Sequence, residues 1–300
     1  MRRTFFFILI VALLGGCSLA PTYTRPEAPV PASWPASSGP QADKTKQAAA
    51  DVPWKEFIVD EKLQKVIGLA LSNNRDLRVA ALNVERTQAL YRIQRAELFP
   101  VVATDFKAVK QHARISGGTG LVTLEEYGAN LGISSWEIDF FGRIRSLSKR
   151  ALEEYFATEQ ARRSAQILLI SEVASAYLTL AADRENLKLA QSTLESQQAA
   201  YKVIRRRFEV GITPELDLQQ VQTRVDAARV DVARFTELAA KAENALNLLA
   251  GSTVPADLLP PELSVVKPLP DVSPGISSEV LLRRPDILQA ENLLKAANAN

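Results

Sequence analysis

The stretch VGITPELD, residues 210–217, joins the two longest helical patterns of this 300-residue chain. Upstream of it, residues 143–209 contain neither proline nor glycine. At about 1.5 Å of rise per residue, one uninterrupted helix over that range would be roughly 100 Å long. We therefore predict a single very long helix that ends at this stretch.

The stretch itself holds residues that end one helix and begin another. Gly211 suits the left-handed position just beyond a helix end. Thr213 suits an N-cap, and Pro214 suits the first helical residue. Asp217 lies in the predicted first turn, where a negative charge interacts favourably with the helix dipole. The sequence thus predicts a tight reversal between two antiparallel helices.

The return segment carries apolar residues at alternating spacings of three and four. They are Leu218, Val221, Val225, Ala228, Val232, Phe235, Ala239, Ala242, Leu246 and Leu249. This spacing is typical of a coiled-coil seam. Two ordinary helices of a bundle are the alternative, but such helices average only about 11 or 12 residues. We expect a long helical hairpin over residues 142–251, with Gly251 ending it.

Residues 100–141 behave differently, because apolar side chains recur there at every second position. The alternating sets are Val102, Thr104, Phe106 and Ala108, and then Tyr127, Ala129, Leu131 and Ile133. We predict two strands, each apolar on one face and polar or tiny on the other. Such a hairpin suits a membrane barrel with lipid outside and a wet lumen inside. A half-buried soluble hairpin has the same period, so the two interpretations stay open on these strands alone.

Two aromatic residues follow the second strand pattern. We expect Trp136 and Phe140 to share a strand face and to lie in the aromatic girdle at a bilayer edge. Ordinary core packing is the alternative for both. Gly142 then lets the chain turn into the long helix.

The flanking segments suggest a repeated plan. Residues 54–99 are predicted to be helical, with a soft break at 72–74 and an end at Phe99-Pro100. After a proline-rich connector at 252–276, a new helical pattern starts at 277. Three identities recur at an offset of 210 residues: Leu71/Leu281, Asp76/Asp286 and Ala80/Ala290. We expect residues 277–300 to be the truncated start of a second repeat, and the chain to be the N-terminal portion of a longer protein.

The N-terminus has the features of a secretory signal. A basic start and an apolar run precede Gly15 and Gly16, and the only cysteine of the chain, Cys17, follows. The order resembles the lipobox of bacterial lipoproteins; a chance cysteine after an ordinary signal is the alternative. The resemblance implies a signal peptide over residues 1–16, N-acyl and S-diacylglycerol modification of Cys17, and a lipid-anchored, proline-rich leader over 17–53.

Composition argues against other kinds of chemistry. The single histidine, His112, is expected to be an exposed loop residue, and no second His or Cys completes a metal site or a nucleophile–base pair. Without Arg2 and Arg3 of the signal, basic and acidic residues are equal in number, so nothing favours nucleic acid. No second apolar run reaches 18 residues, so we expect no transmembrane helix after the signal, and any later membrane crossing is expected to use strands. We therefore expect no enzyme, no metal site and no cofactor.

Several stretches together resemble one family. They are the lipobox and its leader, NNRDLRVAALNVE (73–85), YRIQRAELFP (91–100), WEIDFFGRIRS (136–146), VGITPELDLQQ (210–220) and LLRRPDI (281–287). They look like the outer-membrane factor channels of the TolC type, in the lipoprotein branch that serves multidrug efflux. The resemblance implies a mainly α fold with a membrane β-hairpin, in which three protomers share a β-barrel and a periplasmic α-barrel. It also implies that residues 211–217 form the tip that gates the duct and meets the pump adaptor, with Asp217 lining it. A plain helix-capping role for Asp217 is the alternative.

The resemblance implies a passive, lipid-anchored, homotrimeric duct in the outer membrane, with most of the chain in the periplasm. It would work with a periplasmic adaptor and an inner-membrane pump, and export small amphipathic drugs or solvents. The alternative is a lipid-anchored periplasmic adaptor, which also has a coiled-coil hairpin. The strands expected at 101–110 and 127–138 favour the duct.

Overall fold

The computed structural model describes residues 21–27, 52–114, 121–270 and 278–300. The elements in chain order are α2 (Trp54–Phe57), α3 (Glu61–Asn73), α4 (Arg75–Ala96), β1 (Val101–Arg114), β2 (Leu121–Ser135), α5 (Arg143–Glu209), α6 (Glu215–Ala250), the 3-10 turns η2 (Leu263–Val265) and η3 (Ser278–Arg283), and α7 (Pro285–Asn298). They form two compact units. The strand unit comprises Met1–Glu27, Asn83–Glu159 and Leu288–Asn300, and the core unit comprises Ala28–Leu82 and Gln160–Ile287.

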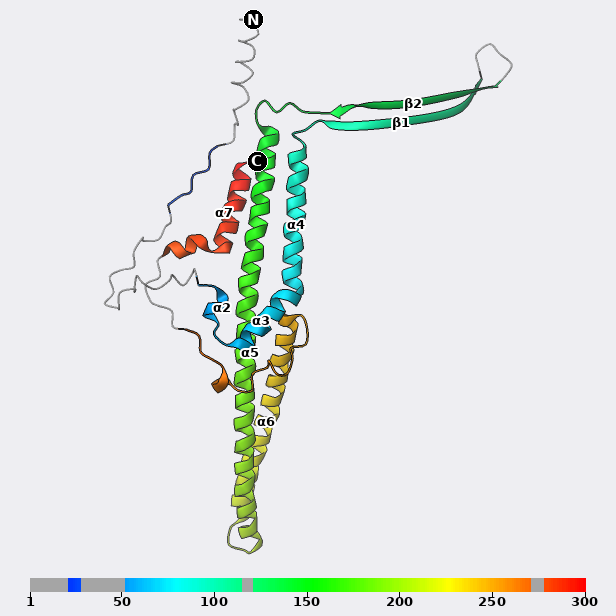
Figure 1. The fold of residues 1–300 in the computed structure, drawn as a ribbon. Coiled ribbons are helices and arrows are strands. Elements are labelled where there is room, and N and C mark those ends of the chain that lie inside the picture. The colour runs from blue at the N-terminus through cyan, green and yellow to red at the C-terminus, as the bar shows by residue number, and fades with distance from the viewer. Residues whose placement is uncertain (1–20, 28–51, 115–120, 271–277) are drawn as a thin grey trace. The chain divides into compact units, whose positions relative to one another are not determined.

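The predicted long helix is confirmed with its bounds unchanged, since α5 runs from Arg143 to Glu209. Gly211 has a φ of 76° and donates its N–H to the carbonyl of Phe208, as expected for a residue just past a helix end. The return helix α6 lies back beside α5 (Figure 1). Gly251 ends α6 in the left-handed conformation, also as predicted.

The predicted start of α6 is wrong by one residue. Pro214, not Thr213, is the N-cap, because its ψ of 158° is extended rather than helical. Its carbonyl accepts the N–H of Asp217, which closes the first turn. Thr213 precedes the cap, where its side chain makes no capping bond in the described part of the chain.

The helical segment predicted for residues 54–99 consists of three helices in the structure. The expected break at 72–74 is confirmed, because α3 ends at Asn73 and α4 begins at Arg75, whereas the break between α2 and α3 was not predicted. Asp60 caps α3, with its carboxylate accepting the N–H of Leu63 at 2.9 Å. Asn74 in turn accepts the N–H of Leu77 at 2.9 Å and begins α4. Each cap supplies a side-chain acceptor for a free N–H of the first turn, so the chain restarts a helix at each of these residues.

The start of α7 matches the offset noted in the sequence. α4 begins at Arg75 and α7 begins at Pro285, and each has an aspartate as its second residue. An aspartate in the first turn is favoured by the helix dipole in both cases.

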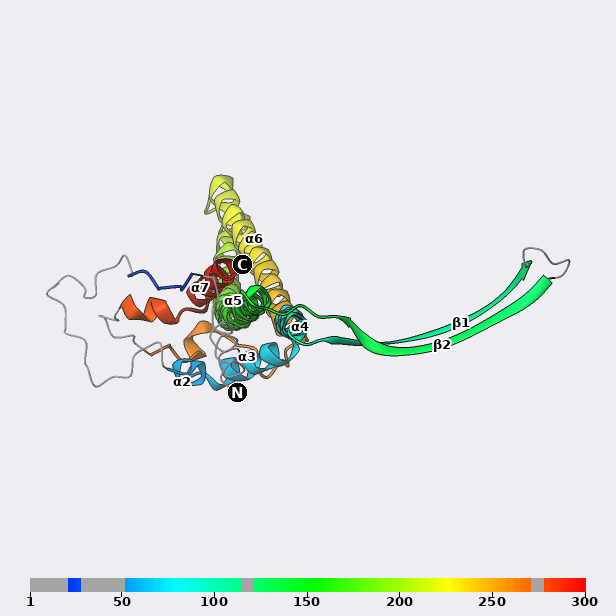
Figure 2. The ribbon, with the colours of Figure 1, turned by 90° about the horizontal axis from the view of Figure 1, so that it is seen from above.

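The hairpin is antiparallel, and its register pairs Phe106 with Ala129 and Ala108 with Tyr127. Both strands are longer than predicted, and they lie side by side over their whole length (Figure 2). A register shift between Val101 and Val102 lies at the end of the ribbon nearest α4.

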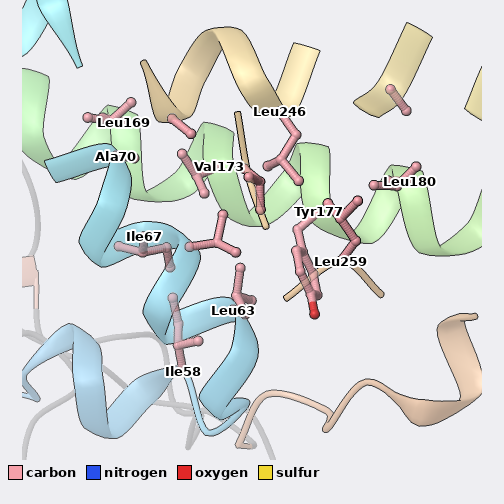
Figure 3. Packing of buried hydrophobic residues seen from close by; sticks show 14 residues of the cluster. Ile58, Leu63, Ile67, Ala70, Leu169, Val173, Tyr177, Leu180, Leu246 and Leu259 are labelled. Atoms are coloured by element: carbon pink, nitrogen blue, oxygen red, sulfur yellow. The ribbon is translucent and has the colours of Figure 1, made fainter. Parts of the chain in front are cut away.

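The core unit buries an apolar cluster where α3, α5, α6 and the connector meet (Figure 3). Its labelled members include Ile67, Val173, Tyr177, Leu246 and Leu259. Tyr177 is 1% exposed, and its hydroxyl donates to the carbonyl of Leu258 at 3.2 Å. Burial, helped by the nearby Asp60 carboxylate, raises the pKa of Tyr177 to about 12. The tyrosine is therefore a neutral donor that attaches the connector to α5.

The prediction that no second apolar run reaches 18 residues is wrong, because α5 contains a stretch of that length that is apolar by composition. The most apolar 18 residues of α5 reach a mean hydropathy of 1.5, enough by composition for a membrane span, and 28% of them are buried. The core explains this apolarity, since Leu169, Val173 and Leu180 of α5 pack in the buried cluster. The signal is therefore weak evidence for a spanning helix.

Candidate functional site

One face of the β-hairpin is apolar and exposed. Its members are Val102 (65% exposed), Phe106 (80%), Tyr127 (74%), Leu131 (75%) and Ile133 (63%). Fully burying such a side chain is worth about 1.5–3 kcal/mol, so this face is stable only when something apolar covers it. The opposite face carries Asp105, Lys107, Gly128, Asn130 and Gly132, which suit contact with water.

The apolar face of the hairpin ends abruptly on the side of the strand tips. Lys110 and Glu125 follow Ala108 and Tyr127 on the same face, and their charged groups pair at 2.5 Å. His112 comes next, with its Nδ1 2.8 Å from the Thr123 hydroxyl. The prediction that His112 lies in a loop is wrong, because His112 is an exposed residue of β1. Lysine at 110 and histidine at 112 are the signal that would have shown the end of the apolar pattern.

The prediction that the two aromatics share a strand face is wrong. β2 ends at Ser135, so Trp136 and Phe140 lie beyond the strand and do not share a strand face. Both remain more than half exposed, at 54% and 55%. The Trp136 indole N–H donates to the carbonyl of Leu98 at 3.4 Å, which connects the two ends of the hairpin. The reason for the difference is the sharp turn that follows.

Two arginine–carboxylate pairs hold that turn, and we call residues 137–145 the clasp. Glu137 pairs with Arg143, and Asp139 pairs with Arg145, each six residues apart. Gly142, between them, has a φ of 81°, which favours glycine. The clasp was not predicted, although the sequence shows two acidic residues, each followed six positions later by an arginine.

Asp139 also begins α5. Its Oδ2 accepts the backbone N–H of Arg145 at 3.0 Å, and the first turn of α5 contains no acidic residue of its own. Desolvation acts to raise the pKa of Asp139, but hydrogen bonds from the backbone and side chain of Arg145 and from the backbone of Ile144 outweigh it and hold the pKa below its usual value. The ionised carboxylate thus stabilises the helix start.

The lowered pKa of Asp139 predicts acid sensitivity at the start of α5. A depressed folded-state pKa contributes stability that is present above the ordinary value of about 4 and is lost as the pH falls through the folded one. We expect the backbone N–H groups of Ile144 and Arg145 to exchange hydrogen faster, relative to intrinsic rates, below about pH 4. Asp139→Asn should remove this pH dependence and, because the amide oxygen can still accept the N–H but the charge at the helix start is lost, cost about 0.5 kcal/mol of local stability at pH 7. Glu237→Gln, which removes an exposed pair with Lys241 on α6, is the matched control and should change neither. An unchanged pH profile in Asp139→Asn would contradict the assignment.

A cleft of about 560 Å³ opens beside the clasp. It is lined by Gln94, Glu97, Phe99, Val101, Ser135, Trp136, Glu137, Arg143, Ile144 and Leu147. Aromatic rings and an ion pair therefore lie together at the foot of the apolar ribbon.

At the other end of α5, the structure brings the predicted tip residues into one turn. Gly211 and Pro214 are exposed, while Thr213 and Asp217 are partly exposed. The same turn presents three apolar side chains that the sequence analysis did not single out: Val210 (59% exposed), Ile212 (74%) and Leu216 (66%). Exposed apolar side chains at a hairpin tip are typical of a contact surface.

The remaining predictions concern lipid attachment at Cys17 and the expected absence of a metal site. Cys17 lies outside the described residues. Within the ranges that the structure describes, no group of three or more His, Cys, Asp or Glu residues could hold a metal ion.

Among the described residues, a two-faced β-hairpin followed along the chain by a long helical hairpin defines a mainly α fold that includes an antiparallel hairpin. The chain belongs to the outer membrane efflux protein family, whose model matches residues 66–252.

Comparisons with individual proteins agree. The chain is 46% identical to the probable efflux pump outer membrane protein TtgC of Pseudomonas putida and 40% identical to the outer membrane protein OprJ of Pseudomonas aeruginosa. Each match covers 100% of this chain and 63% of the relative, so the chain spans under two thirds of the relatives' length. Among solved structures, a Pseudomonas aeruginosa membrane protein matches with a TM-score of 0.80 and 38% identity, over 94% of this chain and 63% of that one. The open state of the Neisseria gonorrhoeae MtrE outer membrane channel matches with a TM-score of 0.78 and 33% identity, over 95% and 62%. The predicted fold class is thereby confirmed.

Proposed function

We propose that this chain belongs to the outer-membrane channel subunit of a tripartite efflux system. The subunit forms a passive homotrimeric duct that exports small amphipathic drugs or solvents. The observation that carries the proposal is the hairpin, whose exposed apolar face leads directly into a 67-residue helix. Neither two strands nor the four per protomer that the family resemblance implies can close a barrel, and open strand edges are not tolerated in lipid, so we infer that several chains share one.

The names of relatives support the cargo class. Proteins 46% and 43% identical to this chain are named for efflux of toluene, antibiotics and solvents. All three terms fit a duct for small amphipathic or apolar molecules.

The membrane attachments come from two parts of the chain. After removal of the signal, Cys17 carries N-acyl and S-diacylglycerol groups, and no other cofactor is needed. Trp136 and Phe140 lie at the foot of the apolar face, where aromatic rings fit the bilayer interface. The subunit is therefore lipid-anchored in the outer membrane, with the helices in the periplasm.

The tip combines a docking surface with a gate. Ile212 and Leu216 give a periplasmic adaptor an apolar contact, and an inner-membrane pump supplies the energy. Gly211, Thr213 and Pro214 shape the turn. Three copies of Asp217, brought together by trimer symmetry, form a carboxylate ring that favours cations.

Single-channel recording of the full-length protein in planar bilayers tests this function. We expect discrete, cation-selective steps from trimers, and a severalfold larger open probability for Asp217→Ala. Glu215→Ala removes an exposed acid from the same first turn of α6 and should leave gating unchanged. Silent bilayers together with a monomeric protein would overturn the duct and favour the adaptor.

A further inference from the structure

We propose that residues 21–25, which we call the strap, dock in register on one face of α7 and thereby fix the place where the lipid on Cys17 enters the bilayer. The inference rests on the lipidation proposed above. Strap and helix are both in the strand unit, which contains Met1–Glu27 and Leu288–Asn300.

Three contacts of different kinds hold the strap. The Arg25 guanidinium binds the Glu291 carboxylate through two nitrogens, with Nε 2.9 Å from Oε1. The Lys295 ammonium lies 5.6 Å from the centre of the Tyr23 ring. The Asn298 side-chain amide donates to the carbonyl of Pro21 at 2.7 Å.

The spacing of these contacts shows a register. On the strap, the contact residues are two apart; on the helix, Glu291, Lys295 and Asn298 follow at four and three and share one face. Two residues of extended chain advance about 6.6 Å. Four and three helical residues advance about 6.0 and 4.5 Å. An extended segment running antiparallel to the helix therefore stays in step with it, which a chance surface ion pair would not do.

The contact between Arg25 and Glu291 depends on their opposite charges. The side chain of Glu291 is only 12% exposed, and its Oε1 also lies 3.3 Å from the Lys295 ammonium. The Arg25 hydrogen bond is the largest of the effects that lower the pKa of Glu291. Without Arg25, the nearly buried Glu291 carboxylate would lose much of the charge interaction that offsets its desolvation. The helix α7 therefore favours a cation at position 25.

The docked strap limits the reach of the lipid. Cys17 is four residues before Pro21, so it lies at most about 14 Å away. The C-terminal end of α7 is near the start of α5, because Arg150 donates to the side chain of Asn300 at 2.8 Å. Arg150 is seven residues, or about 10 Å, along α5 from Arg143 of the clasp. The docked strap thus keeps the acyl chains within reach of the C-terminal end of α7, in the strand unit that also contains Trp136.

Limited proteolysis of the full-length, lipidated protein tests the docking. Chymotrypsin cleaves after Tyr23 only when the strap leaves α7, and mass spectrometry of the released N-terminal peptide measures the rate. We expect Arg25→Glu to raise this rate about tenfold, and the charge exchange Arg25→Glu/Glu291→Arg to restore it to within about twofold of wild type. Arg284→Glu, which reverses an arginine paired with Asp286 away from the strap, is the matched control and should leave the rate unchanged. Asn298→Ala, which removes an uncharged contact, should raise it about threefold.

Equal cleavage in wild type and Arg25→Glu, or no restoration by the exchange, would overturn the proposal. The same samples separate it from the proposed function. The mass of the N-terminal peptide reports lipidation, and bilayer recording reports the channel. Silent bilayers with the expected cleavage pattern would count against the duct alone, and normal conductance with uniform cleavage would count against the strap alone.

Discussion

Replacing Gly251 by alanine is expected to lower the free energy of unfolding of the core unit by about 4 kcal/mol. Gly251 has a φ of 69°, which costs an L-residue roughly 1–2 kcal/mol. An added Cβ would also overlap the carbonyl oxygen of Asn73 and lie 2.7 Å from its carbonyl carbon, which is backbone at the end of α3. The backbone cannot yield there, because Asn74 also donates its side-chain amide to the carbonyl of Leu249 at 2.9 Å.

Two other glycines give graded controls for this prediction. Gly211 has a similar φ of 76° but open space around it, so alanine there should cost only about 1 kcal/mol. Gly68, inside α3, has no strained φ and nothing within 4 Å of an added Cβ, so alanine should be neutral or stabilise by up to about 1 kcal/mol. Denaturant unfolding followed by circular dichroism measures all three. Equal losses at positions 251 and 211 would show that strain alone, rather than the close approach to α3, makes Gly251 necessary.

Replacing Leu131 by lysine is expected to prevent stable insertion of the hairpin in lipid. Leu131 is 75% exposed in the middle of the apolar face, opposite Thr104. A lysine facing lipid near the bilayer centre costs about 2–4 kcal/mol, and a trimer carries three copies. We expect the variant to lose most of the membrane-extracted, SDS-resistant trimer on gels while its helical circular dichroism is kept.

Asn130→Lys is the matched control, because residue 130 is adjacent in sequence but lies on the opposite face of the strand, paired with Asp105. It should assemble as the wild type does. If both lysine variants assembled equally well, the face of Phe106 and Leu131 would not be the lipid face.

The long helices were the most predictable elements. Residues 143–209 lack every helix breaker, and α6 carries its seam in a regular spacing, so local preference and packing agree. The strands were also recognisable, because alternation survives even where no partner strand is known. Prediction was poorer where single side chains compete for backbone groups. The break at 72–74 was predicted, but the second break, where Asp60 caps α3, was not, and Pro214 displaced Thr213 as the cap.

In the candidate site, too, features set by neighbouring residues could be predicted and features set by distant side chains could not. The tip residues are consecutive in sequence, so their proximity could be predicted. Trp136 and Phe140 were misplaced, because the clasp pairs residues six apart and ends the strand one residue before Trp136. The strap could not have been anticipated, since Arg25 and Glu291 are 266 residues apart.

The periodic parts of this protein could be derived from its residues alone: a two-faced ribbon, a long helical hairpin and the turn between its helices. Periodicity is a local property, and each residue contributes to it independently of distant ones. Three features emerge only in the folded chain: the close approach of Gly251 to Asn73, the burial of Tyr177 under the connector, and the register of the strap on α7. Those features depend on side chains that meet across long separations in sequence, and no local pattern contains that information.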